Sequence, residues 1–267
     1  MTSSLLQLDN VTKRFGRVVI AEELSLSVGA GDTVGIVGPN GAGKTSLFGL
    51  ISGDLAPGAG EVRFAGRTVT KLDSAARCRL GIGRTYQVPR PFGDMTVFEN
   101  LLVAAQQGGG LRRRASYAAA VSALERADIS GHANVPAERL GLLQRKRLEL
   151  ARALATQPTL LLLDEVAGGL TDPEVAQLVE IVRGVNADGI AVIWIEHVVR
   201  ALTSCVSRLI CLSGGQFVGD GAPDAVLAEP AVREVFLGSE VSAALAGGSL
   251  EATGTGDGTA SAERSEP

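Results

Sequence analysis

The segment "GPNGAGKT", residues 38–45, places three glycines ahead of a lysine and a threonine. It satisfies the pattern G-x-x-x-x-G-K-[ST] between an apolar run and a helical pattern, which is the context of a phosphate-binding loop. Glycines let main-chain N–H groups curl around phosphates, and the start of the next helix adds a favourable dipole. We predict that Lys44 holds the β- and γ-phosphates of ATP and that the Thr45 hydroxyl reaches Mg²⁺. The alternative, a glycine-rich turn that matches by chance, is disfavoured by the flanking elements. The predicted nucleotide-binding residues of this loop are Gly38, Pro39, Asn40, Gly41, Ala42, Gly43, Lys44, Thr45 and Ser46.

A second candidate lies about 120 residues later, where the apolar run "LLLLDE" ends in Asp164 and Glu165. The carboxyl ends of strands are where open α/β sheets bind ligands. We therefore predict that Asp164 joins the nucleotide site and binds Mg²⁺ through water. Glu165 is predicted to orient and deprotonate the attacking water. A helix-capping role for the pair is the alternative, which the spacing after the phosphate loop disfavours.

Two further polar residues follow apolar stretches. Gln87, in "GRTYQ", is predicted to contact Mg²⁺ or the attacking water and to report the nucleotide state to the helical segment after it. His197 ends "AVIWIEH". A histidine at a strand end is often a structural hydrogen-bonder, but the expected position of its strand beside that of Asp164 favours contact with the γ-phosphate. The predicted catalytic residues are Glu165, His197 and Gln87, and the predicted Mg²⁺ ligands are Thr45, Gln87 and Asp164.

The elements that must position these residues can be read from hydrophobic periodicity. Near-continuous apolar runs at 33–38, 159–165 and 191–197 are typical of parallel strands covered on both faces. Helical patterns follow the first two runs, and alternation of strand and helix predicts an α/β core. The alternating segments "LLQLDNVTKRF", "LSLSV" and "GEVRFAG" predict a small antiparallel layer. The predicted fold is thus α/β: a P-loop NTPase core with a mostly parallel sheet, an N-terminal antiparallel β layer and an inserted helical subdomain.

Composition suggests the domain boundaries. Between about 88 and 156 the strand pattern gives way to segments rich in Ala, Leu and Arg, which predict a helical subdomain inserted in an ATPase domain of residues 1–238. Residues 239–267 are small and polar, too poor in core-forming side chains to offset the entropy of ordering. We predict that this tail is disordered.

The overall composition limits the class of partner. The 267 residues carry a formal net charge of −4 and are 4% aromatic, which disfavours nucleic acid as a partner. The three cysteines form no C-x-x-C pair, consistent with a reducing cytoplasm. No basic-then-apolar leader is apparent, and no apolar run approaches the ~18 residues of a transmembrane helix. We expect any role at a membrane to act through a partner.

The order of these motifs resembles the nucleotide-binding subunit of an ABC transporter over roughly residues 5–238. The stretches "GIGRTYQVPRPFGDMTVFENLLVAA" and "VREVFLG" look most like subunits of branched-chain amino-acid importers. The resemblance implies an ATPase that uses ATP and Mg²⁺ and pairs head to tail with a second ATPase subunit, in a homodimer or heterodimer. It also implies transmembrane permease subunits, a solute-binding protein reached through them, and a peripheral place on the cytoplasmic face of the membrane. By this resemblance Phe15 stacks on adenine, and residues 88–96 lie near the groove for a permease helix.

The family also has a signature segment that contacts the ATP of the opposite chain, and two stretches compete for it. "LSGGQ", residues 212–216, has the usual spelling but follows Asp164 by about 48 residues, whereas the family places the signature before it. Its flanks indicate a hairpin turning at Gly214 and Gly215, so we expect Ala at either glycine to affect stability more than ATP turnover. The family's position is occupied by "LGLLQ", that is Leu140, Gly141, Leu142, Leu143 and Gln144.

The second stretch departs from the usual signature, with glycine in place of serine and two leucines in place of glycines. Leucine adds bulk and restricts φ, and glycine lacks the serine hydroxyl. We therefore expect a weakened signature and hypothesise an asymmetric heterodimer, in which the site built on this chain's phosphate loop hydrolyses well and the opposite site mainly binds. The predicted function is the ATP-driven motor for uptake of a small polar solute, with branched-chain amino acids as the expected cargo. The alternatives are a regulatory nucleotide-binding module with little turnover and a soluble ABC ATPase without a transport role.

Overall fold

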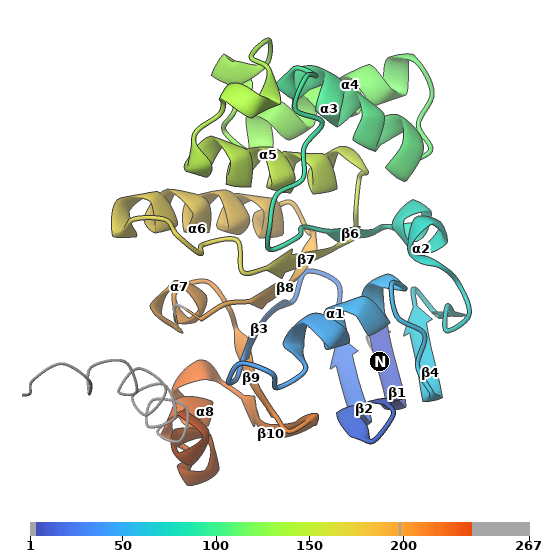
Figure 1. Cartoon of the computed structure of the whole chain (residues 1–267), viewed down its shortest axis with the longest axis vertical. Coiled ribbons are helices and arrows are strands. Elements are labelled where there is room, and N and C mark those ends of the chain that lie inside the picture. Colours follow the sequence, from blue (N-terminus) through green and yellow to red (C-terminus); the bar gives the residue numbers. More distant parts are fainter. Residues whose placement is uncertain (1–3, 198, 237–267) are drawn as a thin grey trace, which may run out of the picture.

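The computed structural model describes residues 4–197 and 199–236 of the protein, arranged as two sheets with helices around them (Figure 1). The smaller sheet is antiparallel, with strand order β2-β1-β4-β5. The larger has the order β10-β9-β3-β8-β7-β6, in which all neighbours pair in parallel except β10 with β9. The strands are β1 Leu6–Phe15, β2 Val18–Val28, β3 Thr33–Val37, β4 Ala59–Phe64, β5 Arg67–Thr68, β6 Ile82–Arg84, β7 Leu160–Asp164, β8 Ala191–Ile195, β9 Arg208–Ser213 and β10 Gln216–Gly221.

The helices fall into two groups. Those between β6 and β7 lie together at the top of Figure 1, and the others accompany the two sheets. The helices are α1 Lys44–Ser52, α2 Ser74–Leu80, α3 Val97–Val103, α4 Arg114–Arg126, α5 Leu142–Ala155, α6 Asp172–Ala187, α7 Val199–Thr203 and α8 Pro223–Ala228, with a π-helical turn at Ala104–Gly108 and 3₁₀ turns at Ser130–His132 and Ala137–Arg139. Within the described ranges, no helix is long and apolar enough to cross a membrane.

The parallel sheet lies between two hydrophobic cores. Side chains alternate across a strand, so Leu160 and Leu162 of β7 join the core with α1 and the antiparallel sheet. Leu161 and Leu163 join the core with α3, α4, α5 and α6. Because both faces are covered, every residue of β3, β7 and β8 is buried. This burial explains the continuous apolar runs, and the predicted α/β fold with its antiparallel layer is confirmed.

Two features next to the predicted core were not expected from the sequence. The short β6 pairs with β7 and immediately precedes the helical segment. The hairpin of β9 and β10 was expected, but its position beside β3 was not. It turns at Gly214 and Gly215, with φ of 56° and 80°, which confirms the hairpin assigned to "LSGGQ". The domain boundaries stay a prediction, and the tail predicted for 239–267 lies outside the described residues.

Candidate nucleotide-binding site

Residues 38–43 form the loop between β3 and α1, at the carboxyl end of the parallel sheet. Glycine is required at both ends of this loop, because an ideal Cβ on Gly38 would lie 2.0 Å from the carbonyl oxygen of Leu212. A Cβ on Gly43 would lie 2.5 Å from that of Ile20, and φ at Gly43 is 104°. The main chain therefore approaches its neighbours too closely for any side chain. Tight glycine-bearing turns of this kind are the ones whose N–H groups can cradle a phosphate.

Lys44 opens α1 and folds back over this loop. Its Nζ donates to the carbonyl oxygens of Gly38 at 2.7 Å and Pro39 at 2.9 Å. Burial lowers the pKa of Lys44, while the carboxylates of Glu165 and Asp164 oppose that shift. The loop borders a hollow of about 300 Å³, in which loop residues and the predicted catalytic carboxylate meet. The residues lining it are Ile20, Gly41, Ala42, Gly43, Lys44, Thr45, Ser46 and Glu165.

Asp164 ends β7 and is almost fully buried. Its Oδ2 accepts from Nη2 of Arg84 at 3.0 Å, and its Oδ1 has no partner among the described residues. Burial raises the pKa of Asp164, and the neighbouring Arg84 opposes that shift. A free carboxylate oxygen and the exposed Thr45 are oxygen donors of the kind that Mg²⁺ prefers. The residues present therefore fit the expected ion.

The three predicted catalytic side chains are joined by hydrogen bonds. Oε1 of Glu165 lies 2.7 Å from Nε2 of His197, and its Oε2 accepts from Nε2 of Gln87 at 2.5 Å. The main chain of Glu165 has a φ of 48°, and its N–H donates to the carbonyl of Ile195 at 2.9 Å. The pairing of β7 with β8, which was expected, brings Glu165 and His197 together. Gln87 contacts the predicted catalytic carboxylate of Glu165 itself, an arrangement that its predicted role on Mg²⁺ or water did not include.

One other predicted residue, Phe15, lies apart from this group. Phe15 ends β1 with 53% of its surface exposed, and the Lys13 ammonium lies 5.2 Å from its ring centre. Phe15 does not line the hollow beside Lys44. An exposed aromatic ring suits a stacking platform for adenine, and that role stays a prediction.

The second signature candidate opens α5, as the resemblance implies. Gly141 is the N-cap residue and makes no side-chain capping bond. Its φ is −68°, and within this described segment, residues 140–144, no residue has a positive φ. The expected restriction of φ by leucine is therefore not a source of strain here. The remaining differences are the missing hydroxyl and the bulk of Leu142, which is 47% exposed and lies near Gly169, whereas Leu143 is buried.

The literal "LSGGQ" lies behind the phosphate loop of its own chain. The N–H of Gly215 donates to the carbonyl of Ala42 at 3.3 Å, and the carbonyl of Gly215 accepts from Glu22 at 2.9 Å. The segment joins two strands, so it offers no helix N-terminus to a phosphate. Its contact with the loop was not apparent from the sequence.

Several buried charged residues beside the site were also missed. Arg84 ends a strand too short to show periodicity, and Lys146 and Glu149 are masked by the alternating charges of α5. Glu196 accepts from the N–H of Ala167 at 2.6 Å and from Nε1 of Trp194 at 3.3 Å, and burial raises its pKa. For Glu196 the sequence did offer a signal, because an acidic residue stands at the end of the apolar run "AVIWIEH".

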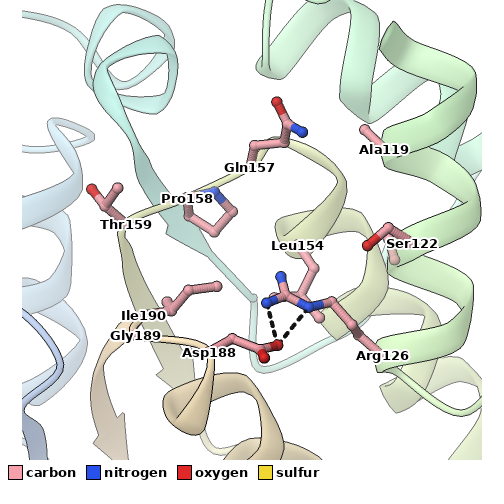
Figure 2. Close-up of a pocket in the computed structure, with 11 residues that line it drawn as sticks. Ala119, Ser122, Arg126, Leu154, Gln157, Pro158, Thr159, Asp188, Gly189 and Ile190 are labelled. Carbon is pink, nitrogen blue, oxygen red and sulfur yellow. Dashed lines mark hydrogen bonds and ion pairs between the residues drawn. The ribbon is translucent and has the colours of Figure 1, made fainter. Parts of the chain in front are cut away.

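A hollow of similar size lies at the opposite, amino ends of β7 and β8 (Figure 2). Thr159 precedes β7 and Ile190 precedes β8, and an ion pair between Arg126 and Asp188 closes one side. None of the predicted site residues lines this hollow. The candidate nucleotide site therefore stays at the carboxyl ends of the strands, where the predicted residues lie.

Comparisons with known proteins show what the whole chain is similar to. The sequence model of a family described as "ABC transporter" matches residues 21–168. The high-affinity branched-chain amino acid transport ATP-binding protein LivG of Salmonella typhimurium is 34% identical over 89% of this chain and 99% of its own. The lipopolysaccharide export system ATP-binding protein LptB of Acidithiobacillus ferridurans is 32% identical over 89% and 98%. The ADP conformation of MJ1267, an ATP-binding cassette of an ABC transporter, is 30% identical over 89% and 100%, with a TM-score of 0.81.

Proposed function

The chain belongs to the ABC transporter family, and from that membership we propose that it is the ATP-hydrolysing subunit of an importer for a small polar solute. It is an ABC ATPase of a transporter. Import, the class of solute and the role of each site residue are the parts that we propose.

The observation that carries the proposal is the contact of Glu165 with both Gln87 and His197 at the edge of the hollow formed by the phosphate loop. A general base must lie within hydrogen-bond reach of the water it deprotonates. Glu165 lines the same hollow as Lys44, which supports a place for its carboxylate beside the γ-phosphate.

In the proposed mechanism, the N–H groups of residues 38–43 and the ammonium of Lys44 bind the phosphates. Thr45, Asp164 and Gln87 would hold Mg²⁺, which would neutralise charge on the β- and γ-phosphates. Glu165 takes the proton of the attacking water. His197 keeps that carboxylate oriented and is placed to contact the γ-phosphate. Phe15 stacks on the adenine.

The proposed partners follow from the family. ABC ATPase subunits of transporters work as dimers with transmembrane permease components. We place residues 140–144, at the start of α5, against the ATP of a second subunit. We expect the exposed Leu142 and the uncapped Gly141 to weaken that contact, and a heterodimer with one strongly hydrolytic site is therefore the proposed assembly.

We propose that a third hollow marks the face of the chain that docks on the permease. It measures about 350 Å³ and lies between α2, α5 and the segment after β6, where Tyr86 and Phe92 expose about half of their surfaces. Residues 88–96 were expected at such a groove. Docking there would hold the chain at the cytoplasmic face of the membrane through the permease, with the solute-binding protein on the permease's other side.

The proposed cargo is a branched-chain amino acid, because relatives named for that transport align over nearly their whole length. A relative named for lipopolysaccharide export aligns almost equally well, so export is the second candidate. A regulatory module with little turnover is disfavoured by the complete set of catalytic side chains around Glu165. A role on nucleic acid is disfavoured by the net charge of −4.

The test is ATP hydrolysis by the complex that co-purifies with this chain, reconstituted in vesicles with its solute-binding protein. We expect leucine, isoleucine or valine to stimulate phosphate release and to accumulate inside the vesicles. Stimulation of phosphate release by lipopolysaccharide would instead favour export as the function. Nucleotide binding without phosphate release would favour the regulatory module.

A further inference from the structure

Helix α5 holds two catalytic residues by their main chains. Nζ of Lys146 donates to the carbonyl oxygen of Gln87 at 3.1 Å and to that of Glu165 at 3.2 Å. These two residues are 78 positions apart in sequence and come from different loops. A single side chain thus fixes the distance between the loop after β6 and the loop after β7.

Placing Lys146 at this position costs free energy, because its ammonium group is buried. It is 5% exposed, and burial of an ammonium is unfavourable unless the charge is partnered. Burial lowers the pKa of Lys146, while the carboxylates of Glu196, Glu165 and Glu149 oppose that shift. An apolar side chain of the same length would fill the space without this cost. The lysine is therefore explained by its two carbonyl partners rather than by packing.

A second residue of the same helix face supports the loop after β6. Glu149, one turn after Lys146, is 4% exposed, and its carboxylate accepts the N–H groups of Tyr86 and Arg90. The main chain around Gln87 is thus held through a carbonyl by one side chain and through N–H groups by the other. Arg152 continues the row by donating to the carbonyl of Arg90 at 3.0 Å. We call Lys146, Glu149 and Arg152 the α5 clamp.

The clamp begins one turn from the segment assigned to the partner's ATP. Lys146 follows Leu142, the first residue of α5, by four positions, which is about 6 Å along a helix axis. A rigid helix turn would transmit a shift of its N-terminus to Lys146 with little loss. The same shift would then reach the carbonyls of Gln87 and Glu165.

We propose that Lys146 is a positioning residue that couples the two ATP sites of the dimer: contact of residues 140–144 with the partner's ATP sets the placement of Gln87 and Glu165 at this chain's own ATP. The inference rests on the proposed function, because it needs the head-to-tail dimer and the catalytic role of Glu165. Lys146 does not line the hollow beside the phosphate loop, and it acts through the main chain of Gln87 and Glu165.

The test compares Lys146→Met, which keeps the length of the side chain but removes its donor, with Lys146→Arg, which keeps a cation. Arg145→Met is the matched control, because Arg145 is the exposed neighbour on α5 and donates to a carbonyl, that of Glu138 at 2.8 Å, away from both catalytic loops. Hydrogen exchange of segments 85–92 and 165–170 is measured on the full nucleotide-free chain. ATP hydrolysis is measured on the assembled complex, normalised to bound ATP.

For Lys146→Met we expect hydrogen exchange in both segments to accelerate about tenfold. In the assembled complex we expect kcat to fall about 10- to 100-fold and KM to stay within about twofold. The Hill coefficient for ATP should approach one. Lys146→Arg should recover part of kcat, and Arg145→Met should match the wild type. Unchanged exchange in Lys146→Met overturns the proposal. So does accelerated exchange with an unchanged kcat, or a raised KM with an unchanged kcat. A wild-type complex that hydrolyses no ATP would refute the proposed function, and the exchange comparison would then still decide whether Lys146 positions the two loops.

Discussion

Nε2 of His197 lies 2.7 Å from Oε1 of Glu165, so an imidazole and a carboxylate meet at the carboxyl ends of two neighbouring parallel strands. The contact depends on the register of β7 and β8, in which Asp164 pairs with Ile195. It also depends on the positive φ of Glu165, which turns the chain back toward β8. The strands thus set the position of the proposed base, and the histidine sets its orientation.

Replacement of Glu165 by glutamine tests the proposed base. Glutamine keeps the size of the side chain but cannot take a proton, so we expect phosphate release at this chain's site to fall about 10²- to 10⁴-fold while ATP still binds. Phosphate release and ATP binding should be measured on the same complex. Glu180→Gln is the control, because Glu180 is exposed and pairs with Arg183 on the outer face of α6. Turnover above a tenth of wild type in Glu165→Gln would assign the base elsewhere.

The Glu165→Gln background also tests the asymmetry of the proposed heterodimer. Residual turnover then comes from the site completed by residues 140–144. We expect the double change Gly141→Ser and Leu142→Gly to raise that residual turnover several-fold, because it restores an N-cap hydroxyl and removes an exposed leucine. The measurement is phosphate release with and without the double change. An unchanged rate would show that this signature is not what limits the opposite site.

The ion pair between Arg84 and Asp164 predicts a loss of stability when it is broken. Both side chains are nearly buried, 9% and 2% exposed, so Arg84→Met leaves a buried carboxylate without its cation. We expect the free energy of unfolding to fall by about 3–5 kcal/mol. Breaking the exposed pair of Arg183 with Glu180 by Arg183→Met should cost less than about 1 kcal/mol. Denaturant unfolding of both variants checks the contrast, and equal losses would contradict it.

The parallel core, the phosphate loop and the acidic strand end were predictable because each depends on local sequence. A strand buried on both faces must be apolar, and a loop that folds its N–H groups around a phosphate needs glycine at defined spacings. The contact of Glu165 with His197 was also within reach, because it follows once their strands are neighbours.

The buried charges could not be predicted, because each is defined by a partner far away in sequence. Lys146 looks like any solvated residue of a charged helix until Gln87 and Glu165 are placed beside it. Arg84 is recognisable only once β6 is paired with β7. The same reason applies to Gly215, whose contact with the phosphate loop requires β9 to lie next to β3.

The contact of Gly215 with the phosphate loop distinguishes it from Gly214, although the sequence predicts the same turn role for both. Both Gly214 and Gly215 have positive φ, so alanine at either should cost about 1–2 kcal/mol of stability. A Cβ on Gly214 meets nothing within 4 Å, whereas one on Gly215 lies 3.2–3.4 Å from the main chain of Ile20 and Ala21. We therefore expect Gly215→Ala also to weaken ATP binding several-fold by shifting the main chain near Ala42, while Gly214→Ala keeps wild-type affinity. Titration with a fluorescent ATP analogue checks this, and equal affinities would restore the purely structural reading of the hairpin.

The buried Glu196 predicts a pH dependence of stability. Burial raises its pKa in the folded protein above the usual value of a glutamate. The folded state therefore binds more protons than the unfolded state between those two pKa values, and stability falls as the pH rises through that interval. Nearby, Glu165 opposes the ionisation of Glu196 and the ammonium of Lys146 favours it, so the measured interval reports on all three groups. We expect Glu196→Gln, which keeps an oxygen for the N–H of Ala167, to gain melting temperature relative to wild type as the pH is raised from about 4.5. Melting curves of both proteins from acid to neutral pH give this difference. A difference that stays constant with pH would show that Glu196 ionises in the folded protein as readily as in the unfolded chain.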